Sequence, residues 1–215
     1  MKTRTVFDEQ LLVLGGAVAG MGDLVLQALE EAVAALTQHD VALAQKVMQG
    51  DDVIDDKEEE IERYCLRLIV QQQPVAHDLR YILSAFKIIK DLERIGDHAE
   101  DISEYAVLFA ENPYINRLER IPKMAQAALK MVSRSIDAFV RKDLELARSI
   151  IVYDDKVDNL FLSVKQELKE LKKESADKGN PAVDLIMLAK YFERIGDHAT
   201  NIAEWVVFCL TGEHK

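Results

Sequence analysis

Acidic residues recur at four-residue spacing in two copies of one short motif. The stretch ERIGDHA occupies residues 93–99 and again residues 193–199, continuing as ERIGDHAEDISE in the first copy and ERIGDHATNIAE in the second. On a helix, with about 100° between successive residues, the polar residues of each copy fall within roughly 80° of one another. The two faces carry Glu93, Asp97, Asp101 and Glu104 in the first copy and Glu193, Asp197, Asn201 and Glu204 in the second.

A second acidic stripe precedes each copy of the motif. Asp52 and Asp55 share one helical face in the first half of the chain, and Asp155 and Asp158 do so in the second. Like charges at four-residue spacing destabilise a helix by about a few tenths of a kcal/mol per pair. A multivalent cation would offset this repulsion, and oxygen ligands without cysteine suit hard cations such as Mg²⁺, Ca²⁺, Mn²⁺ or oxidised iron. The sequence therefore predicts metal sites on these stripes.

Other interpretations of the stripes stay open from the residues alone. An acidic helix face is ordinarily solvated and binds nothing. Arg94 and Arg194 would neutralise part of each stripe by pairing with neighbouring carboxylates. His98 and His198, at the rim of the same face, are either metal ligands or exposed rim residues.

The chain lacks the sequence motifs of several enzyme classes. It has no Glu-x-x-His, which di-iron carboxylate bundles use, and no Gly-x-Ser-x-Gly or Walker loop. We therefore expect a non-enzymatic protein without catalytic residues. The alternative is a metal-dependent helical enzyme such as a carboxylate-bridged hydrolase, which needs an open coordination position and a general base. A structural bundle whose acidic faces bind nothing is a third hypothesis.

The elements that position these stripes come from an internal repeat. LAQKVMQGDDVID at 43–55 matches LARSIIVYDDKVD at 146–158 with an offset of 103, while the ERIGDHA copies match with an offset of 100. Apolar residues recur at three- and four-residue steps, which indicates helices. The expected helices are 7–38, 41–72 and 75–110 in the first half and 118–141, 144–176 and 182–211 in the second.

The predicted fold is all-α, with two tandem antiparallel three-helix bundles packed side by side. The first bundle is expected over residues 5–112 and the second over 117–212, joined by ENPYINR at 111–117. Asp40 and Asp143 stand where N-caps belong. Gly96 and Gly196 predict close packing by another helix. In the first helix, Gly15, Gly16, Gly20 and Gly22 indicate either close helix approach or a local break.

Composition limits the classes of partner. The chain carries 38 acidic against 27 basic residues, a formal net charge of −11, which argues against nucleic acid as a partner. Cys65 and Cys209 lie in apolar helical patterns and are expected to be buried thiols in a reducing compartment. The uncharged run 11–22 is shorter than the ~20 residues of a membrane span. Asp8 and Glu9 ahead of it argue against a cleaved signal peptide.

At the repeated motifs the chain resembles the PhoU family, the accessory and regulatory proteins of bacterial phosphate-specific transport. The resemblance is carried by DLERIGDHAEDI at 91–102, YFERIGDHATNI at 191–202 and QQQPVAHDLR at 71–80. It extends from about residue 7 to residue 210 and covers both repeats. The family's acidic pattern, Glu or Asp followed four residues later by Asp, matches Glu93 with Asp97 and Glu193 with Asp197.

The resemblance implies a regulatory adaptor. It implies partners in the ATPase subunit of the phosphate ABC transporter and a membrane sensor histidine kinase, and repression of phosphate-starvation genes and uptake when phosphate is plentiful. It also implies a cytoplasmic homodimer, peripheral to the inner membrane at most. Metal ions on the acidic motifs are implied too: iron first, with zinc, manganese, magnesium and calcium as alternatives. Asn201 in place of Asp101 departs from the first repeat and predicts that the two sites differ.

Overall fold

Six long helices make up the described part of this computed structural model, which comprises residues 2–110, 120–174 and 181–213. The helices are α1 (Lys2–Gln38), α2 (Val41–Gln72), α3 (Ala76–Phe109), α4 (Arg120–Arg141), α5 (Leu144–Glu174) and α6 (Pro181–Thr211). No strand occurs within these residues. The all-α prediction is therefore confirmed, and observed helix ends differ from those expected by a few residues. The expected linker at 111–117, the expected start of the fourth helix at residue 118 and the expected end of the fifth helix at residue 176 lie outside the described residues.

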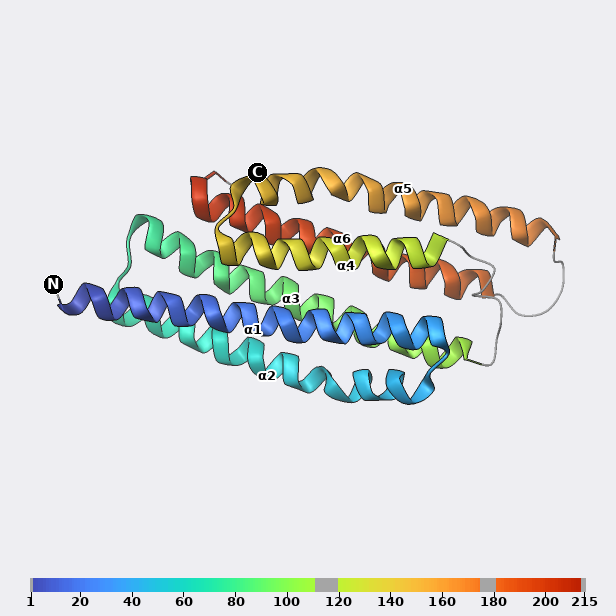
Figure 1. Ribbon diagram of the computed structural model, residues 1–215, viewed down its shortest axis with the longest axis horizontal. Helices are drawn as coiled ribbons and strands as arrows, with labels where there is room; N and C mark the ends of the chain where they lie inside the picture. Colours follow the sequence, from blue (N-terminus) through green and yellow to red (C-terminus); the bar gives the residue numbers. More distant parts are fainter. Residues whose placement is uncertain (1, 111–119, 175–180, 214–215) are drawn as a thin grey trace.

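The six helices run along the long axis of the molecule as two antiparallel three-helix bundles (Figure 1). In the first bundle α1, α2 and α3 each contact both others, and in the second α5 and α4 both pack on α6 and on each other. The bundles meet mainly through α3 with α6 and α1 with α4. We call the α3–α6 contact the seam. Because the repeated motif lies on α3 and α6, the seam brings its two copies together.

The middle helix of each bundle begins at a capped N-terminus, as predicted. The Leu43 amide donates to Asp40 Oδ1 at 3.0 Å, and the Leu146 amide donates to Asp143 Oδ1 at 2.9 Å. Each cap satisfies one amide that the helix itself leaves without a partner. These matching turns fix where α2 and α5 start, and so which side chains they present to α3 and α6.

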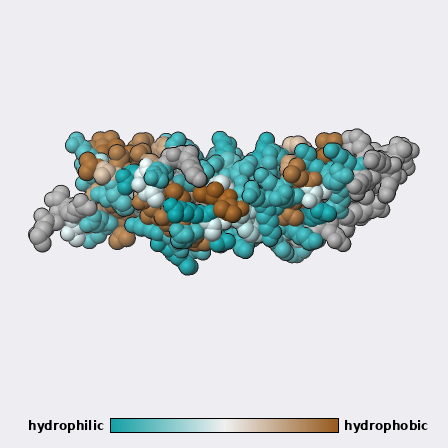
Figure 2. Space-filling view, turned by 90° about the horizontal axis from the view of Figure 1, so that it is seen from above, coloured by the Kyte–Doolittle hydropathy of each residue, from teal (hydrophilic) through white to brown (hydrophobic). Residues whose placement is uncertain are grey.

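The core is a continuous apolar cluster drawn from all six helices, and it includes both cysteine side chains. Within the described residues one helix, α1, is long and apolar enough to cross a membrane by length and composition. Its inner face is part of the core, with Leu14, Met21, Val25 and Leu29 fully buried. In a view turned from that of Figure 1, hydrophilic residues form most of the surface, with apolar patches between them (Figure 2). Packing in the bundle accounts for the apolar residues on this inner face, whereas Leu12 and Val13 are exposed.

The glycines of α1 allow close helix approach, and the helix passes through them without a break. A Cβ at Gly22 would lie 2.9 Å from two carbons of Ile136 on α4, and one at Gly15 would collide with the Tyr81 hydroxyl on α3. Gly16 and Gly20 face open space. Close approach, one of the two explanations left open by the sequence, therefore accounts for Gly15 and Gly22.

Candidate metal centre

Three carboxylates from two helices converge between α2 and α3. Asp51 and Asp55 on α2 and Asp97 on α3 each place one oxygen within 4.8 Å of the others. Burial, then the negative charge of Asp55, raises the pKa of Asp51 to about 6. The acidic stripes of the middle and third helices therefore do meet in one groove, and the ionised form of Asp51 is destabilised there.

Two further carboxylates of α3 border this first acidic cluster. Burial raises the pKa of Glu93, with Asp97 adding to the effect. Burial also raises the pKa of Glu100, followed by the charge of Glu104. The negative charge of Asp55, across the groove, also raises the pKa of both side chains. We define the first acidic cluster as Asp51, Asp55, Glu93, Asp97 and Glu100.

An arginine on the same helix neutralises part of the first acidic cluster. Arg94 donates from Nη1 to Asp97 Oδ2 at 2.6 Å, and its Nε lies 3.3 Å from Glu93 Oε2. Arg94 is exposed, so these ion pairs compete with water and contribute modestly to stability. One interpretation left open by the sequence, pairing of Arg94 with the stripe, is thus present alongside the cluster.

The second bundle carries the corresponding residues with one substitution, but among the described residues only the first set brings three carboxylate oxygens within 4.8 Å of one another. Burial, then the charges of Asp197 and Asp158, raises the pKa of Asp154 to about 6. Burial and the charge of Glu193 raise the pKa of Asp197. Thr200 occupies the position that corresponds to Glu100. We define the second acidic cluster as Asp154, Asp158, Glu193, Asp197 and Thr200.

Two oxygens of the second acidic cluster are buried without a hydrogen bond among the described residues. Asp154 Oδ1 has no hydrogen-bond partner among the described residues, and neither has Thr200 Oγ1. The Thr200 hydroxyl lies near enough to lower the pKa of Asp154, although the geometry falls short of a hydrogen bond. A buried, unpaired carboxylate oxygen is costly, and a coordinated cation would satisfy it.

Glycine at the centre of each motif makes room for both clusters. A Cβ at Gly96 would lie 3.1 Å from a methyl carbon of Ile54 and 3.4 Å from Asp51 Oδ1. A Cβ at Gly196 would lie 3.2 Å from Asp154 Oδ1. The prediction that these glycines permit close packing by another helix is confirmed. They also let the first aspartate of each middle helix reach the groove.

The structure separates the predicted ligands into those that meet and those that do not. Asp55, Glu93 and Asp97 belong to the first acidic cluster, and Asp158, Glu193 and Asp197 to the second. Asp52 and Asp155 are exposed, and it is Asp51 and Asp154, one position earlier, whose charges couple to α3 and α6. In the stretch DDVIDD the four aspartates spread over an arc of roughly 140° of the helix. Four-residue spacing alone does not separate Asp51 from Asp52, because Asp52 has Asp56 four residues later. The second repeat does separate them, since Asn159 replaces Asp56 there and only Asp154 keeps an aspartate, Asp158, four residues later.

Asp101 and Asn201 face the seam instead of the acidic clusters. Asp91 Oδ1 accepts a hydrogen bond from Asn201 Nδ2 at 3.0 Å. The same oxygen lies 2.8 Å from His198 Nδ1. We call Asp91, His198 and Asn201 the first trio. Across the seam, the second trio comprises Tyr191, His98 and Asp101 at the corresponding positions. There His98 Nδ1 lies 3.0 Å from Asp101 Oδ2, and the His98 and Tyr191 rings are 5.4 Å apart.

The two trios explain why the repeats differ at Asp101 and Asn201. Each trio holds one carboxylate beside one imidazole, supplied by Asp91 in the first and by Asp101 in the second. An aspartate at position 201 would set two carboxylates side by side at the first trio. Asn201 is therefore accounted for by the seam. His98 is buried and His198 is partly buried, so neither is the exposed rim residue that one interpretation of the sequence described.

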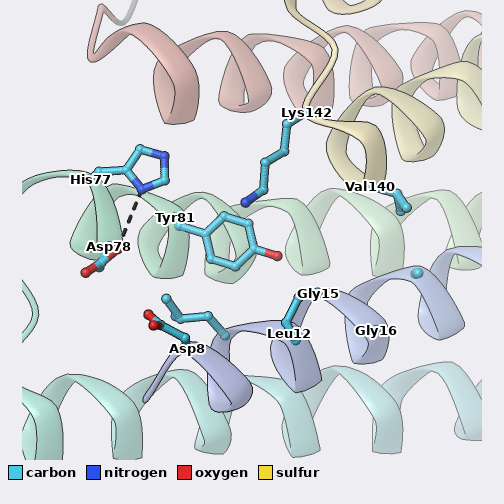
Figure 3. Close-up of a pocket in the computed structure, with 11 residues that line it drawn as sticks. Asp8, Leu12, Gly15, Gly16, His77, Asp78, Tyr81, Val140 and Lys142 are labelled. Carbon is cyan, nitrogen blue, oxygen red and sulfur yellow. Dashed lines mark ion pairs between the residues drawn. The ribbon is translucent and has the colours of Figure 1, made fainter. Parts of the chain in front are cut away.

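A separate cavity of about 490 Å³ opens where α1, the start of α3 and the end of α4 meet (Figure 3). The Tyr81 hydroxyl lies over Gly15, and the ring stacks on Phe139 at a centroid distance of 5.4 Å. The Lys142 ammonium lies 5.1 Å from the Tyr81 ring centre. Burial raises the pKa of Tyr81 to about 12, which keeps its hydroxyl protonated. None of the predicted metal ligands lines this cavity.

The donor set of the acidic clusters fits a hard cation. Both clusters offer carboxylate oxygens from two helices, and the second adds a hydroxyl. Such all-oxygen sets suit Mg²⁺, Ca²⁺, Mn²⁺ and iron. The unpaired Asp154 Oδ1 and the raised pKa of Asp51 are both features that a bound cation would relieve. The chemistry available is therefore metal binding that links α2 to α3 and α5 to α6.

Comparison with known proteins agrees with the repeat. The PhoU domain family matches residues 18–106 and again residues 121–206. The "Phosphate-specific transport system accessory protein PhoU homolog" of Clostridium acetobutylicum is 35% identical over 212 residues, covering 98% of this chain and 97% of that protein. The homolog of the same name from Aquifex aeolicus is 41% identical over 196 residues, covering 91% of this chain and 89% of that protein.

Solved structures show the same fold. The crystal structure of PhoU from Pseudomonas aeruginosa matches with a TM-score of 0.89 and 35% sequence identity, covering 96% of this chain and 100% of that one. The crystal structure of the phosphate transport system regulatory protein PhoU from Streptococcus pneumoniae matches with a TM-score of 0.89 and 29% identity, covering 97% and 99%.

Proposed function

The chain belongs to the PhoU family, and on that premise we propose that it is a non-enzymatic accessory protein of a phosphate-specific transport system. The observation that carries this proposal is near full-length similarity, at 35–41% identity, to proteins that bear that name. Both acidic clusters of the family's repeated pattern are present here, each built from two helices.

The finer proposal is a cytoplasmic adaptor between transport and gene regulation. The protein binds the ATPase subunit of the phosphate ABC transporter and a membrane sensor histidine kinase, and it represses phosphate-starvation genes and uptake when phosphate is plentiful. It acts as a homodimer at the inner membrane face. An adaptor of this kind needs rigid surfaces, and two fused bundles with a shared core supply them.

Metal ions held by the two acidic clusters are part of the proposal, with iron first and zinc, manganese, magnesium and calcium as alternatives. Asp51, Asp55 and Asp97 would hold an ion in the first cluster, and Asp154, Asp158 and Asp197 in the second. The bound ion supplies positive charge where carboxylates from two helices repel one another. The unpaired oxygen of Asp154 supports this part of the proposal.

Metal content is the direct test of the acidic clusters. We expect the dialysed protein to carry several ions per chain by elemental mass spectrometry, and Asp97→Ala with Asp197→Ala to lose them while helical content by circular dichroism persists. The matched control is Asp52→Ala with Asp155→Ala, which removes the same charge from exposed positions of the middle helices. Equal metal content in both double variants would contradict the assignment.

The regulatory role is tested in the source organism. Deletion of the gene is expected to raise phosphate-starvation gene expression in phosphate-rich medium, and the wild-type chain is expected to restore repression. Normal repression in the deletion strain would contradict the proposal.

A phosphatase assay of the purified chain with added Mn²⁺ or iron addresses the hydrolase alternative. That alternative predicts turnover that Asp97→Ala with Asp197→Ala abolishes.

A further inference from the structure

Three exposed lysines line one cavity in this acidic protein. The cavity has a volume of about 280 Å³ and opens between α4 and α5. It is lined by Lys123, Gln126, Ala127, Lys130, Tyr153, Lys156 and Leu160. The lining contains no aspartate or glutamate, although the chain as a whole has a net charge of −11. We call this cavity the lysine groove.

Two of these lysines share a single aromatic ring. Lys130 Nζ lies 4.9 Å and Lys156 Nζ 5.1 Å from the centre of the Tyr153 ring, and Lys156 Nζ also donates to Tyr153 Oη at 3.2 Å. Among the described residues, neither ammonium forms an ion pair with a carboxylate. The ring attracts both cations, but it carries no net negative charge that would offset the repulsion between the two ammonium groups.

Another ring in the second bundle shows the contrasting arrangement. Lys165 and Lys190 both lie over Phe161, at 5.1 Å and 5.5 Å from its centre. There, however, Lys190 forms an ion pair with Glu193. Shared rings thus occur twice on this bundle, but only the pair of lysines in the lysine groove has both ammonium groups without an acidic partner among the described residues.

The internal repeat supplies a comparison cavity. A groove of about 180 Å³ lies between α1 and α2, and Leu24, Gln27, Gly50 and Val53 among its lining residues precede four lining residues of the lysine groove by 103 positions. Equivalent side chains also bridge the two helices in each bundle. Glu31 pairs with Lys46 at 2.8 Å in the first bundle, and at the same positions Arg134 donates to Ser149 at 2.9 Å in the second.

The charge of the groove differs between the two repeats. Gln27 and Val53 of the first groove correspond to Lys130 and Lys156 of the second, and Gly20, which does not line the first groove, corresponds to Lys123. Two acidic residues, Asp23 and Glu31, are replaced by Gln126 and Arg134. The same backbone framework therefore presents a mixed groove in one bundle and a cationic groove in the other, so the backbone fold alone does not require the cationic residues.

We propose that the lysine groove binds a phosphate group, free or as a phosphate ester. The polar groups that line it are donors of hydrogen bonds to an anion: three ammonium groups, the Gln126 amide and the Tyr153 hydroxyl. A phosphate group carries up to two negative charges and offers only acceptor oxygens, which matches this set. An ordinary protein carboxylate would neutralise one of the three cations. This inference goes beyond the proposed role in transport and depends on neither the transporter nor the acidic clusters.

Binding of phosphate to the purified, chelator-treated full chain tests the proposal. The probes are inorganic phosphate and ATP, followed by equilibrium dialysis at low salt, and vesicles containing phosphatidylglycerol, followed by co-sedimentation. We expect Lys130→Gln with Lys156→Gln to weaken binding of at least one probe by about tenfold or more. Lys130→Arg with Lys156→Arg, which keeps both charges, is expected to retain binding within about threefold. Saturable binding of inorganic phosphate identifies the free ion as a ligand, and binding of ATP or vesicles alone identifies an ester.

The matched control removes two other lysines that lie over aromatic rings. Lys87 lies 5.8 Å from the Trp205 ring centre and Lys165 lies over Phe161, so Lys87→Gln with Lys165→Gln loses the same charge and similar ring contacts. It is expected to change affinity by less than about twofold. Equal weakening by the control and the groove variant, or no binding of any probe, would overturn the proposal. The purified chain is used alone, so a negative result in this assay leaves the transport role standing.

Discussion

At the scale of single residues, the acidic clusters combine groups whose ionised forms oppose one another. Asp51 and Asp154 each have a pKa raised to about 6, mainly because they are buried and then because other carboxylates lie near. In metal-free protein, the protonated Asp51 carboxyl is favoured in the native state. Its contribution to folding stability is fully present below the unfolded-state pKa near 3.8 and is lost as the pH rises through the native-state pKa of about 6. A bound cation would reverse the disadvantage of the ionised form.

Asp51→Asn tests this charge opposition. In chelator, at pH 7, the variant is expected to be more stable than the wild type by about 1 kcal/mol, after allowing for partial solvent screening of Asp51. The difference should shrink towards zero as the pH falls to about 3, because the Asp51 carboxyl is then largely protonated in both the native and unfolded states. Urea unfolding at the two pH values measures it. Asp52→Asn, at the exposed neighbour, is the control, and an equal gain there would contradict the role of the groove.

The sequence identified the acidic motif but not every residue that the cluster uses. Glu93 and Asp97 could be predicted from the sequence because both lie in one motif on one helix, which fixes their relative positions. Asp51 was missed in favour of Asp52, since the rotation of α2 about its axis relative to α3 depends on packing at Gly96 and Ile54. Asp101 shares a helical face with Asp97, yet it belongs to the seam because the second bundle covers that side of α3.

At the scale of elements, glycines set how closely neighbouring helices approach. Gly22 allows Ile136 of α4 to pack against the backbone of α1, whereas Gly16 faces open space within the same helix. The helices themselves, their capped starts and their repeat were predictable, because they follow from local periodicity and from Asp40 and Asp143. The sequence could not decide between close helix approach and a break in α1, because the answer depends on side chains that are distant in sequence.

Gly22→Ala and Gly16→Ala form a matched pair. Alanine at position 16 is expected to stabilise the protein by about 0.5–1 kcal/mol, since it improves helix propensity and meets no neighbour. Alanine at position 22 is expected to give no gain or a loss of about 1 kcal/mol, because it must displace Ile136. Thermal or urea unfolding of the two variants compares them directly. A gain at position 22 equal to that at position 16 would show that α1 and α4 pack less closely than described.

At the scale of the whole molecule, the two bundles share one core. Buried residues of α3 and α6 line the seam, and α1 packs on α4. The sequence predicted two bundles packed side by side, and this is confirmed. It left open which helices form the contact, because apolar stripes on all six helices allow several pairings and the trios involve residues that lie about one hundred positions apart.

Unfolding is therefore expected to be one cooperative transition. Trp205, the single tryptophan, lies on α6 and reports on the second bundle, whereas far-ultraviolet circular dichroism reports on all helices. The two signals should follow the same urea curve. Loss of Trp205 fluorescence at a lower urea concentration than the loss of helix would show that the second bundle unfolds independently.

The seam also specifies which bundle pairs with which. Two first bundles facing each other would bring Asp91 of one against Asp101 of the other, with two carboxylates around each imidazole. Two second bundles would leave each imidazole with none. Only the mixed pairing gives each trio one carboxylate. The duplicated halves are therefore complementary to each other and not to themselves. If two chains exchanged halves, each contact between bundles would still pair a first bundle with a second bundle.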